Sequence, residues 1–284
     1  MPKVSVIIPC YNHGVYIEEA IDSLLSQTFE DFEIIVINDD SDDVNTLVVL
    51  NNLNRPKTKI FHTSRKGVSA ARNYGISQSV GEFIFPLDAD DWVDSRFLSL
   101  AVPLLEQNEQ LEIIGSGVQY FGDLNAKEFL PDYHPKQHLL QNLFFNTSVF
   151  RKASFEKING YDEAFINGWE DWDMFLRLVN HPTQVHILKD YLLHYRIKKE
   201  SRNADLMKEK KQRSEQQLFV KHLNKYMEHF PEPIQALRDN AYMSEEIKNF
   251  EKYKAELSGS LSYRIGHLTL SPFKWFSKRI KASK

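Results

Sequence analysis

Three aspartates, Asp88, Asp90 and Asp91, stand together directly after the apolar run 83–87. Carboxylates this close repel one another unless a cation or bound protons balance their charge. Their hard oxygen atoms suit Mg²⁺ or Mn²⁺, which keep coordination positions open for the phosphates of a substrate. The same residues also fit an acidic turn with one residue capping a helix that begins near Asp94. Taken alone, the group indicates either a divalent-metal site or a capped turn.

A second acidic group, Glu170, Asp171 and Asp173, lies in the segment 169–173. We expect a helix to begin here, and the N-terminus of a helix stabilises a carboxylate in its ionised form. An ionised carboxylate can accept a proton from a hydroxyl, a role typically worth about 10²–10⁴-fold in rate. Alternatively, one of the three simply caps the helix. Asp171 and Asp173 are two positions apart and therefore face different sides of the helix.

Short apolar runs alternate with segments of helical periodicity in the part of the chain before Asp88. The runs predict strands at 4–8, 32–37, 59–62 and 82–87. The segments between them predict a helix up to about Gln27, a polar helix carrying Leu47 and Leu50, and a helix over 67–77. This alternation is typical of right-handed βαβ units in a parallel sheet with helices on both faces.

Polar clusters follow three of these predicted strands, at 11–12, 39–43 and 88–91. In α/β sheets ligands bind beyond the carboxyl ends of the strands. The three clusters should therefore meet at one edge of the sheet and form a ligand site there.

The second part of the chain is less regular. We expect a helix up to about Gln107, a strand over 112–120, irregular chain over 121–143 and a loop from 150 that leads into a helix ending near 179. Short strands are predicted at 185–188 and 192–196. Beyond about residue 204 the chain is polar and helical.

Composition excludes several classes of protein. The net charge of −4 over 284 residues does not favour a nucleic-acid binder. A single cysteine, Cys10, rules out an intramolecular disulfide and agrees with a reducing compartment. No apolar run approaches the roughly 18 residues that span a bilayer, and the start of the chain lacks a signal peptide's features. We expect a cytoplasmic protein, soluble or peripheral to the inner face of the membrane.

Several motifs occur in a specific order, at 4–12, 37–43, 67–75, 87–91, 159–163 and 169–173. In order and spacing they closely resemble the family 2 glycosyltransferases, which are inverting enzymes with the GT-A fold. The resemblance covers roughly residues 3–200. It implies an α/β GT-A fold with a mostly parallel central sheet flanked by helices and a helical C-terminal extension. The implied catalytic domain is 1–203, with a nucleotide-binding half at about 1–95 and an acceptor half at about 96–203, and the extension is 204–284.

The resemblance also implies which residues bind the nucleotide sugar: Pro9, Tyr11, Asn12, Glu18, Asp39, Arg72, Asp88, Ala89 and Lys198. Asp39 would accept a hydrogen bond from the base, and Asp88 would bind the ribose. The alternatives to nucleotide binding are purely structural: a helix cap at Asn12, a solvated position at Glu18 and a plain ion pair from Arg72 to the acidic cluster. Asn38 and Asp40 depart from the family's Asp-Asp-Gly-Ser pattern, and an aspartate tolerates the left-handed backbone expected there.

For the chemistry, the resemblance implies Asp171 as general base, Glu170 as the residue that orients it or the acceptor, and Asp90 as ligand of Mn²⁺ or Mg²⁺. Near the end of the segment that resembles the family, Lys198 replaces the histidine that the family usually has. A protonated lysine cannot bind a metal, but it can hold a diphosphate as a point charge. His194 is a weaker candidate for the missing ligand, and a structural role on its strand is the alternative.

The last residues, 261–284, contain six basic side chains, several aromatic ones and no acidic one. Such a segment suits the surface of an anionic membrane. Packing onto the catalytic domain or formation of a homodimer are the alternatives.

Together these features predict transfer of a single sugar from a nucleotide-diphosphate sugar, UDP-linked by preference, to a saccharide or lipid-linked saccharide. The process would belong to the synthesis of a surface polysaccharide or glycolipid. A nucleotidyltransferase also pairs a metal-binding aspartate with such a sheet, but the Gly-rich basic loop that it needs is missing after the first strand. A sugar-nucleotide-binding protein without activity is the alternative from another class.

Overall fold

A computed structural model describes residues 1–64, 66–198 and 208–259. The chain divides into two compact units, Met1–Leu223 and Asn224–Lys284. The first unit extends past the expected boundary at residue 203. The basic aromatic tail expected over 261–284 lies outside the described residues.

Strands and helices alternate at the start of the first unit, as the periodicity predicted. The elements are β1 (Val4–Cys10), α1 (Gly14–Leu25), β2 (Phe32–Asp39), α2 (Val44–Asn52), β3 (Thr58–Thr63), α3 (Val68–Ser77) and β4 (Phe83–Pro86). β1 pairs in parallel with β2 and β4, and β2 pairs in parallel with β3. The carboxyl ends of these strands therefore open onto one edge of the sheet.

The rest of the first unit adds both strands and helices. They are β5 (Trp92–Val93), α4 (Phe97–Gln107), β6 (Ile113–Gly122), β7 (Ala126–Glu128), α5 (Pro135–His138), β8 (Val149–Arg151), α6 (Lys152–Lys157), α7 (Glu170–Leu178), η1 (Pro182–Gln184), β9 (Val185–Ile197) and α9 (Lys208–Lys221). The described residues form a nine-stranded sheet in the order β3-β2-β1-β4-β8-β6-β9-β5, with β7 beside β6. β8 joins β4 and β6 by antiparallel pairing, so the sheet is parallel in its first half and mixed in its second.

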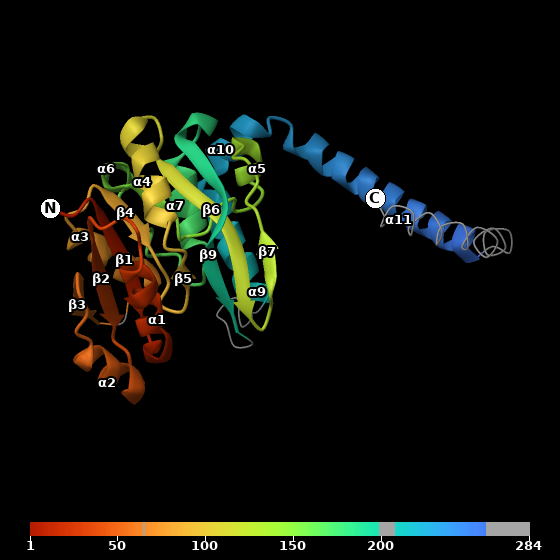
Figure 1. Ribbon diagram of the computed structural model, residues 1–284. Helices are drawn as coiled ribbons and strands as arrows, with labels where there is room; N and C mark the ends of the chain where they lie inside the picture. Colours follow the sequence, from red (N-terminus) through yellow and green to blue (C-terminus); the bar gives the residue numbers. More distant parts are fainter. Residues whose placement is uncertain (65, 199–207, 260–284) are drawn as a thin grey trace, which may run out of the picture. The chain divides into compact units, whose positions relative to one another are not determined.

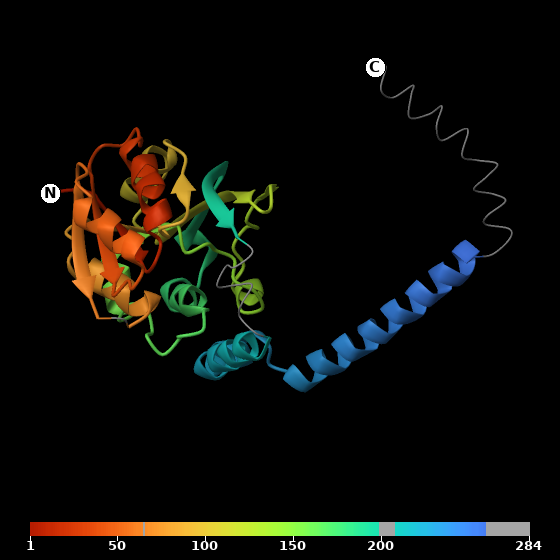
Figure 2. The ribbon, with the colours of Figure 1, turned by 90° about the horizontal axis from the view of Figure 1, so that it is seen from below.

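Side chains on the two faces of the sheet enter two separate cores, because successive residues of a strand point to opposite faces. Val6 and Ile8 of β1 pack with helices α1 and α4, whereas Ile7 packs with α3 and α7. Helices therefore cover both faces, as the views from two directions show (Figures 1 and 2).

Three local expectations differ from the structure. The segment 121–143 contains β7 and α5, and the segment after 150 contains α6, so both are more regular than predicted. The two short strands at 185–188 and 192–196 are one continuous strand, β9, whose pairing with β6 shifts register near Gly117. Polar residues 189–190 interrupt the apolar pattern there, and for that reason the single strand looked like two.

The second unit contains α10 (Leu223–His229), which begins at the boundary, and α11 (Pro233–Gly259). Among the described residues, no helix combines the length and the apolar character required to cross a membrane.

Candidate functional site

Arg72 joins the two halves of the first unit. Its side chain is almost completely buried, with 3% of its surface exposed. Nη2 donates to Asp88 Oδ1 at 2.7 Å, and Nη1 donates to Glu170 Oε1 at 3.0 Å. A buried guanidinium requires such carboxylates, because an unpaired charge away from water is very costly. The contact fixes the loop after β4 to the first turn of α7.

Close packing of α3 against the sheet puts Arg72 in this position. A Cβ atom on Gly75 would lie 2.7 Å from Ile7 Cγ2 and 3.0 Å from Ile37 Cγ1, so only glycine allows the helix to approach so closely. Ala71 is buried in the same core. The small residues around Arg72 thus allow close packing of α3 against the sheet.

The carboxylates after β4 each have a different partner. Lys198 Nζ lies 2.6 Å from Asp90 Oδ2, and His13 Nδ1 lies 3.9 Å from Asp90 Oδ1. Asp91 is buried and accepts a hydrogen bond of 2.8 Å from the backbone N–H of Arg196. Burial, followed by the nearby charges of Asp90 and Asp88, raises the pKa of Asp91 well above its ordinary value. Burial also lowers the pKa of His13, which favours its neutral form.

The end of β9 fastens the same loop. Arg196 Nε donates to the carbonyl oxygen of Asp90 at 2.9 Å, and its guanidinium lies 4.4 Å from the Phe121 ring and 4.7 Å from the Tyr16 ring. Arg196 also forms an ion pair with Glu19. The sequence assigned no role to Arg196.

The donor set fits a hard divalent cation only if the substrate completes it. Asp88 and Asp90 offer carboxylate oxygens from one loop, and Mg²⁺ in proteins is often bound by one or two carboxylates together with substrate phosphates and water. Over the described part of the chain, no group of three or more His, Cys, Asp and Glu side chains is arranged to hold a metal. His194 stacks on Trp92 with ring centres 3.4 Å apart, and no described hydrogen bond or ion pair joins it to Asp90. The stacking therefore supports a structural role of His194 on its strand, and no described contact supports its role as a metal ligand.

Asp39 is buried and holds the connection between β3 and α3. Its carboxylate accepts hydrogen bonds from Thr63 Oγ1 at 3.0 Å, from the backbone N–H of Lys66 at 3.1 Å and from that of Gly67 at 2.9 Å. Gly67 has a φ of +92°, which favours glycine. The carboxylate thereby shapes the loop at the start of α3, and its contact with a base remains a prediction.

Tyr11 and Asn12 are connected to the loop after β2 through Asp42. The Tyr11 hydroxyl donates to Asp42 at 3.1 Å, while Asn12 Oδ1 accepts from the backbone N–H groups of Asp42 and Asp43, both at 3.0 Å. Asn12 and Asp40 adopt left-handed φ values of +56° and +57°. Asp43 caps α2 by accepting from the backbone N–H of Thr46 at 2.7 Å.

The remaining nucleotide candidates lie around these loops. Pro9 is on β1 opposite Ile37, and Ala89 is buried between the aspartates. Glu18 lies on α1 and forms an exposed ion pair of 3.4 Å with Arg55. This exposed ion pair favours a solvated position for Glu18 over a contact with the ligand.

Asp171 and Glu170 occupy the first turn of α7 but have different surroundings. Asn142 Nδ2 donates to Asp171 Oδ2 at 3.1 Å, and the backbone N–H of Trp172 donates to Asp171 Oδ1 at 2.8 Å. Glu170 is buried against Arg72. Asp171 is therefore next to the Arg72 bridge, and its carboxylate is held by hydrogen bonds from Asn142 and from the backbone of Trp172.

Asp173 faces a different side of α7 and binds α9. The carboxylate is completely buried and contacts Arg177 at 2.6 Å, His222 at 2.8 Å and Lys221 at 2.9 Å. Burial raises its pKa, but hydrogen bonds from His222, Arg177 and Lys221 more than offset this and bring the pKa to about 2. The sequence indicated that Asp173 faces a different side of the helix from Asp171. It did not indicate the partners Lys221 and His222, which are 48 and 49 residues away.

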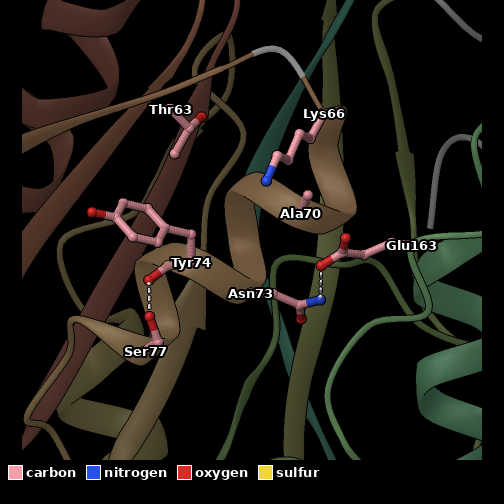
Figure 3. Close-up of a pocket in the computed structure, with 7 residues that line it drawn as sticks. All are labelled: Thr63, Lys66, Ala70, Asn73, Tyr74, Ser77 and Glu163. Atoms are coloured by element: carbon pink, nitrogen blue, oxygen red, sulfur yellow. Dashed lines mark hydrogen bonds between the residues drawn. The ribbon is translucent and has the colours of Figure 1, made fainter.

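A pocket of about 340 Å³ lies beside α3 (Figure 3). It is lined by Thr63, Lys66, Ala70, Asn73, Tyr74, Ser77 and Glu163. Asn73 Nδ2 donates to Glu163 Oε1 at 3.0 Å across it. None of the predicted catalytic or metal-binding residues lines this pocket.

Family models match most of the first unit. The model described as "Glycosyl transferase family 2" matches residues 5–159, and the model described as "N-terminal domain of galactosyltransferase" matches residues 129–200.

Three curated relatives illustrate the range of similar proteins. The uncharacterized glycosyltransferase EpsJ of Bacillus subtilis is 41% identical over 118 residues, which cover 41% of this chain and 34% of that protein. The GalNAc(5)-diNAcBac-PP-undecaprenol beta-1,3-glucosyltransferase of Campylobacter jejuni is 32% identical over 189 residues, which cover 57% and 61%. The chondroitin synthase of Pasteurella multocida is 30% identical over 184 residues, which cover 63% and 19%. The chain thus spans less than two thirds of the length of each of these relatives.

Solved structures share the fold at low identity. TarS 1-349 of S. aureus in complex with UDP-GlcNAc has a TM-score of 0.61 and 19% identity, over 80% of this chain and 73% of that one. The mannosyltransferase PcManGT from Pyrobaculum calidifontis, in complex with GDP-Man and Mn²⁺, has a TM-score of 0.59 and 18% identity, over 95% and 84%.

Proposed function

The chain belongs to glycosyl transferase family 2 and has the GT-A fold, and from this premise we propose that it transfers one sugar, with inversion, from a nucleotide-diphosphate sugar to an acceptor hydroxyl. Family membership sets aside the nucleotidyltransferase alternative. One contact supports the proposal above the others: Arg72 binds Asp88 and Glu170 and thereby brings the loop of the donor carboxylates to the helix that carries Asp171.

In this proposal the acceptor hydroxyl lies against Asp171. The carboxylate takes the proton as the oxygen attacks the anomeric carbon, and Asn142 orients the carboxylate. Glu170 stays bound to Arg72 and holds the first turn of α7 in place. The bond from the sugar to the diphosphate breaks on the opposite side, so the configuration inverts.

The donor occupies the edge formed by the loops after β1, β2 and β4. Asp88 binds the ribose, Asp90 faces the diphosphate, and Tyr11, Asn12 and Asp39 surround the base. A divalent cation, Mn²⁺ or Mg²⁺, bound at Asp90 would neutralise charge on the departing nucleoside diphosphate. The complexes of TarS with UDP-GlcNAc and of PcManGT with GDP-Man and Mn²⁺ support a donor and a cation of these kinds.

The acceptor in this proposal is a saccharide carried on a lipid. The Campylobacter jejuni relative, whose name describes an undecaprenol-linked saccharide, supports this class of acceptor. A place at the inner face of the membrane follows from it. All residues proposed for donor binding and catalysis lie within 1–203, and the proposed extension, 204–284, includes the helix α9, whose end binds Asp173 of α7.

A thermal-shift panel of UDP-, GDP- and dTDP-sugars, with and without Mn²⁺, tests the proposed donor. We expect stabilisation by one nucleotide class, UDP-linked by preference, and release of the corresponding nucleoside diphosphate when a lipid-linked saccharide is added. If none of these donors stabilises the protein, the proposed function is contradicted.

A further inference from the structure

Asp90, the carboxylate expected to bind the metal, is already paired with a cation. Lys198 Nζ lies 2.6 Å from Asp90 Oδ2, and only 23% and 17% of the two side chains are exposed. A protonated ammonium has three donors and no lone pair, so it cannot itself bind a metal, and its positive charge on Oδ2 repels a divalent cation that approaches the same carboxylate. The ammonium and a divalent cation therefore compete for Asp90.

The surroundings of Lys198 allow it to leave without disturbing the loop. Arg196, two residues earlier, holds the loop independently through the Asp90 carbonyl oxygen and the Asp91 carboxylate. Lys198 follows the last residue of β9, and its ammonium also lies 4.7 Å from the Tyr16 ring. Lysine is a compact charge on a flexible four-carbon stem, so it can move between neighbouring anions.

A diphosphate is the anion that would draw the ammonium away. It carries more negative charge than one carboxylate, and the proposed function places it beside Asp90. If the ammonium moves onto the diphosphate, both oxygens of Asp90 become accessible to the metal. Binding of the donor and binding of the metal then favour each other, which means that a coupling free energy links the two ligands.

We propose that Lys198 is an exchangeable counter-ion, which neutralises Asp90 while the donor site is empty and passes to the diphosphate when donor and metal bind. The inference rests on the proposed function of this site. Lys198 thereby makes metal binding depend on the donor, in the position where the family usually has a histidine.

Lys198→Met tests this exchange, because it should change two affinities in opposite directions. Without nucleotide, the variant should bind Mn²⁺ about fivefold more tightly, as measured by electron paramagnetic resonance of free Mn²⁺, and without metal it should bind UDP about fivefold more weakly by calorimetry. Uridine, which has no phosphate, should bind equally to both proteins. Lys198→Arg should stay near the wild-type values, and Lys189→Met, which removes an exposed ion pair with Asp132, is the matched control.

Each result decides the inference. An unchanged Mn²⁺ affinity in Lys198→Met would overturn the competition, and an unchanged UDP affinity would overturn the transfer to the diphosphate. A fall of all three affinities together would show a purely structural role and would also overturn it. If the wild-type protein binds neither uridine nor UDP, nor the nucleoside and diphosphate selected by the donor panel, the proposed function fails and this inference fails with it.

Discussion

Arg72 is surrounded by groups that a guanidinium needs away from water, and they come from distant parts of the chain. Asp88 is 16 residues away and Glu170 is 98 residues away. The Glu170 side chain is as deeply buried as Arg72, whereas 35% of the Asp88 side chain is exposed. Loss of the guanidinium would therefore leave Glu170 as the uncompensated charge.

Arg72→Met should lower the free energy of unfolding by about 3–5 kcal/mol, the usual cost of breaking a buried ion pair on one side. Chemical denaturation measures this value. Combining it with Glu170→Gln should recover part of the loss, because the double variant no longer buries an unpaired charge. Arg55→Met, which removes exposed ion pairs with Glu18 and Asp22, should cost less than about 1 kcal/mol. Equal costs for the two arginines would contradict this account.

Asp171→Asn should lower the transfer rate by about 10²–10⁴-fold, because an amide cannot accept the acceptor's proton. Donor affinity should stay the same, since the proposed donor contacts lie on other residues. Steady-state kinetics and calorimetry with the donor measure the two effects separately. Asp132→Asn, at an exposed position, serves as the control. Retention of the full rate in Asp171→Asn would exclude Asp171 as the base.

At the scale of elements, α7 connects the proposed chemistry to the end of the first unit. Its first turn carries Glu170 and Asp171, and Asp173 in the same turn binds Lys221 and His222 at the end of α9. α9 is therefore part of the structure that holds α7, although its sequence is polar and gave little sign of burial. Leu218 and Ser214 of α9 are buried as well.

The depressed pKa of Asp173 predicts a pH dependence of stability. Its pKa is about 2 in the folded protein, below the ordinary value of 3.8 for an aspartate, so the folded protein holds the ionised form more strongly. The resulting stabilisation, on the order of 2 kcal/mol, is present above about pH 4 and is lost as the pH falls towards 2. The difference in unfolding free energy between wild type and Asp173→Asn should shrink over this interval. Asp31→Asn, at an exposed position, should show no such change, and a constant difference for Asp173→Asn would contradict the assignment.

At the scale of the whole molecule, the two compact units divide after Leu223 rather than after the expected residue 203. The twenty residues between these positions contain α9. The two boundaries therefore differ in whether Asp173 keeps its partners Lys221 and His222.

A chain truncated after Leu223 should keep the donor-induced thermal shift of the full chain, because every predicted donor residue lies in the first unit. A chain truncated after residue 203 should be less stable by about 3–5 kcal/mol, since it leaves a buried carboxylate with only Arg177. Thermal and chemical denaturation compare the two. Equal stability of both truncated chains would show that residues 204–223 do not stabilise the first unit, and would favour the boundary at residue 203.

Local patterns in the sequence predicted the strands and helices before Asp88 and the parallel first half of the sheet. Periodicity is a property of neighbouring residues, so β1 to β4 and α1 to α3 were expected close to their observed bounds. The order of the sequence motifs also predicted the family, because these motifs are short and contiguous. Where the pattern was interrupted, as at 189–190 in β9, the prediction divided one strand into two.

The tertiary structure decided most of the contacts between charged groups. The sequence offered an ion pair from Arg72 to the acidic cluster as an alternative, but only the packed sheet shows that Arg72 also binds Glu170 and that Lys198 neutralises Asp90. It also placed His194 on Trp92 and Asp173 on α9. Such contacts depend on how helices and strands far apart in the chain pack together, and no local pattern of residues contains that information.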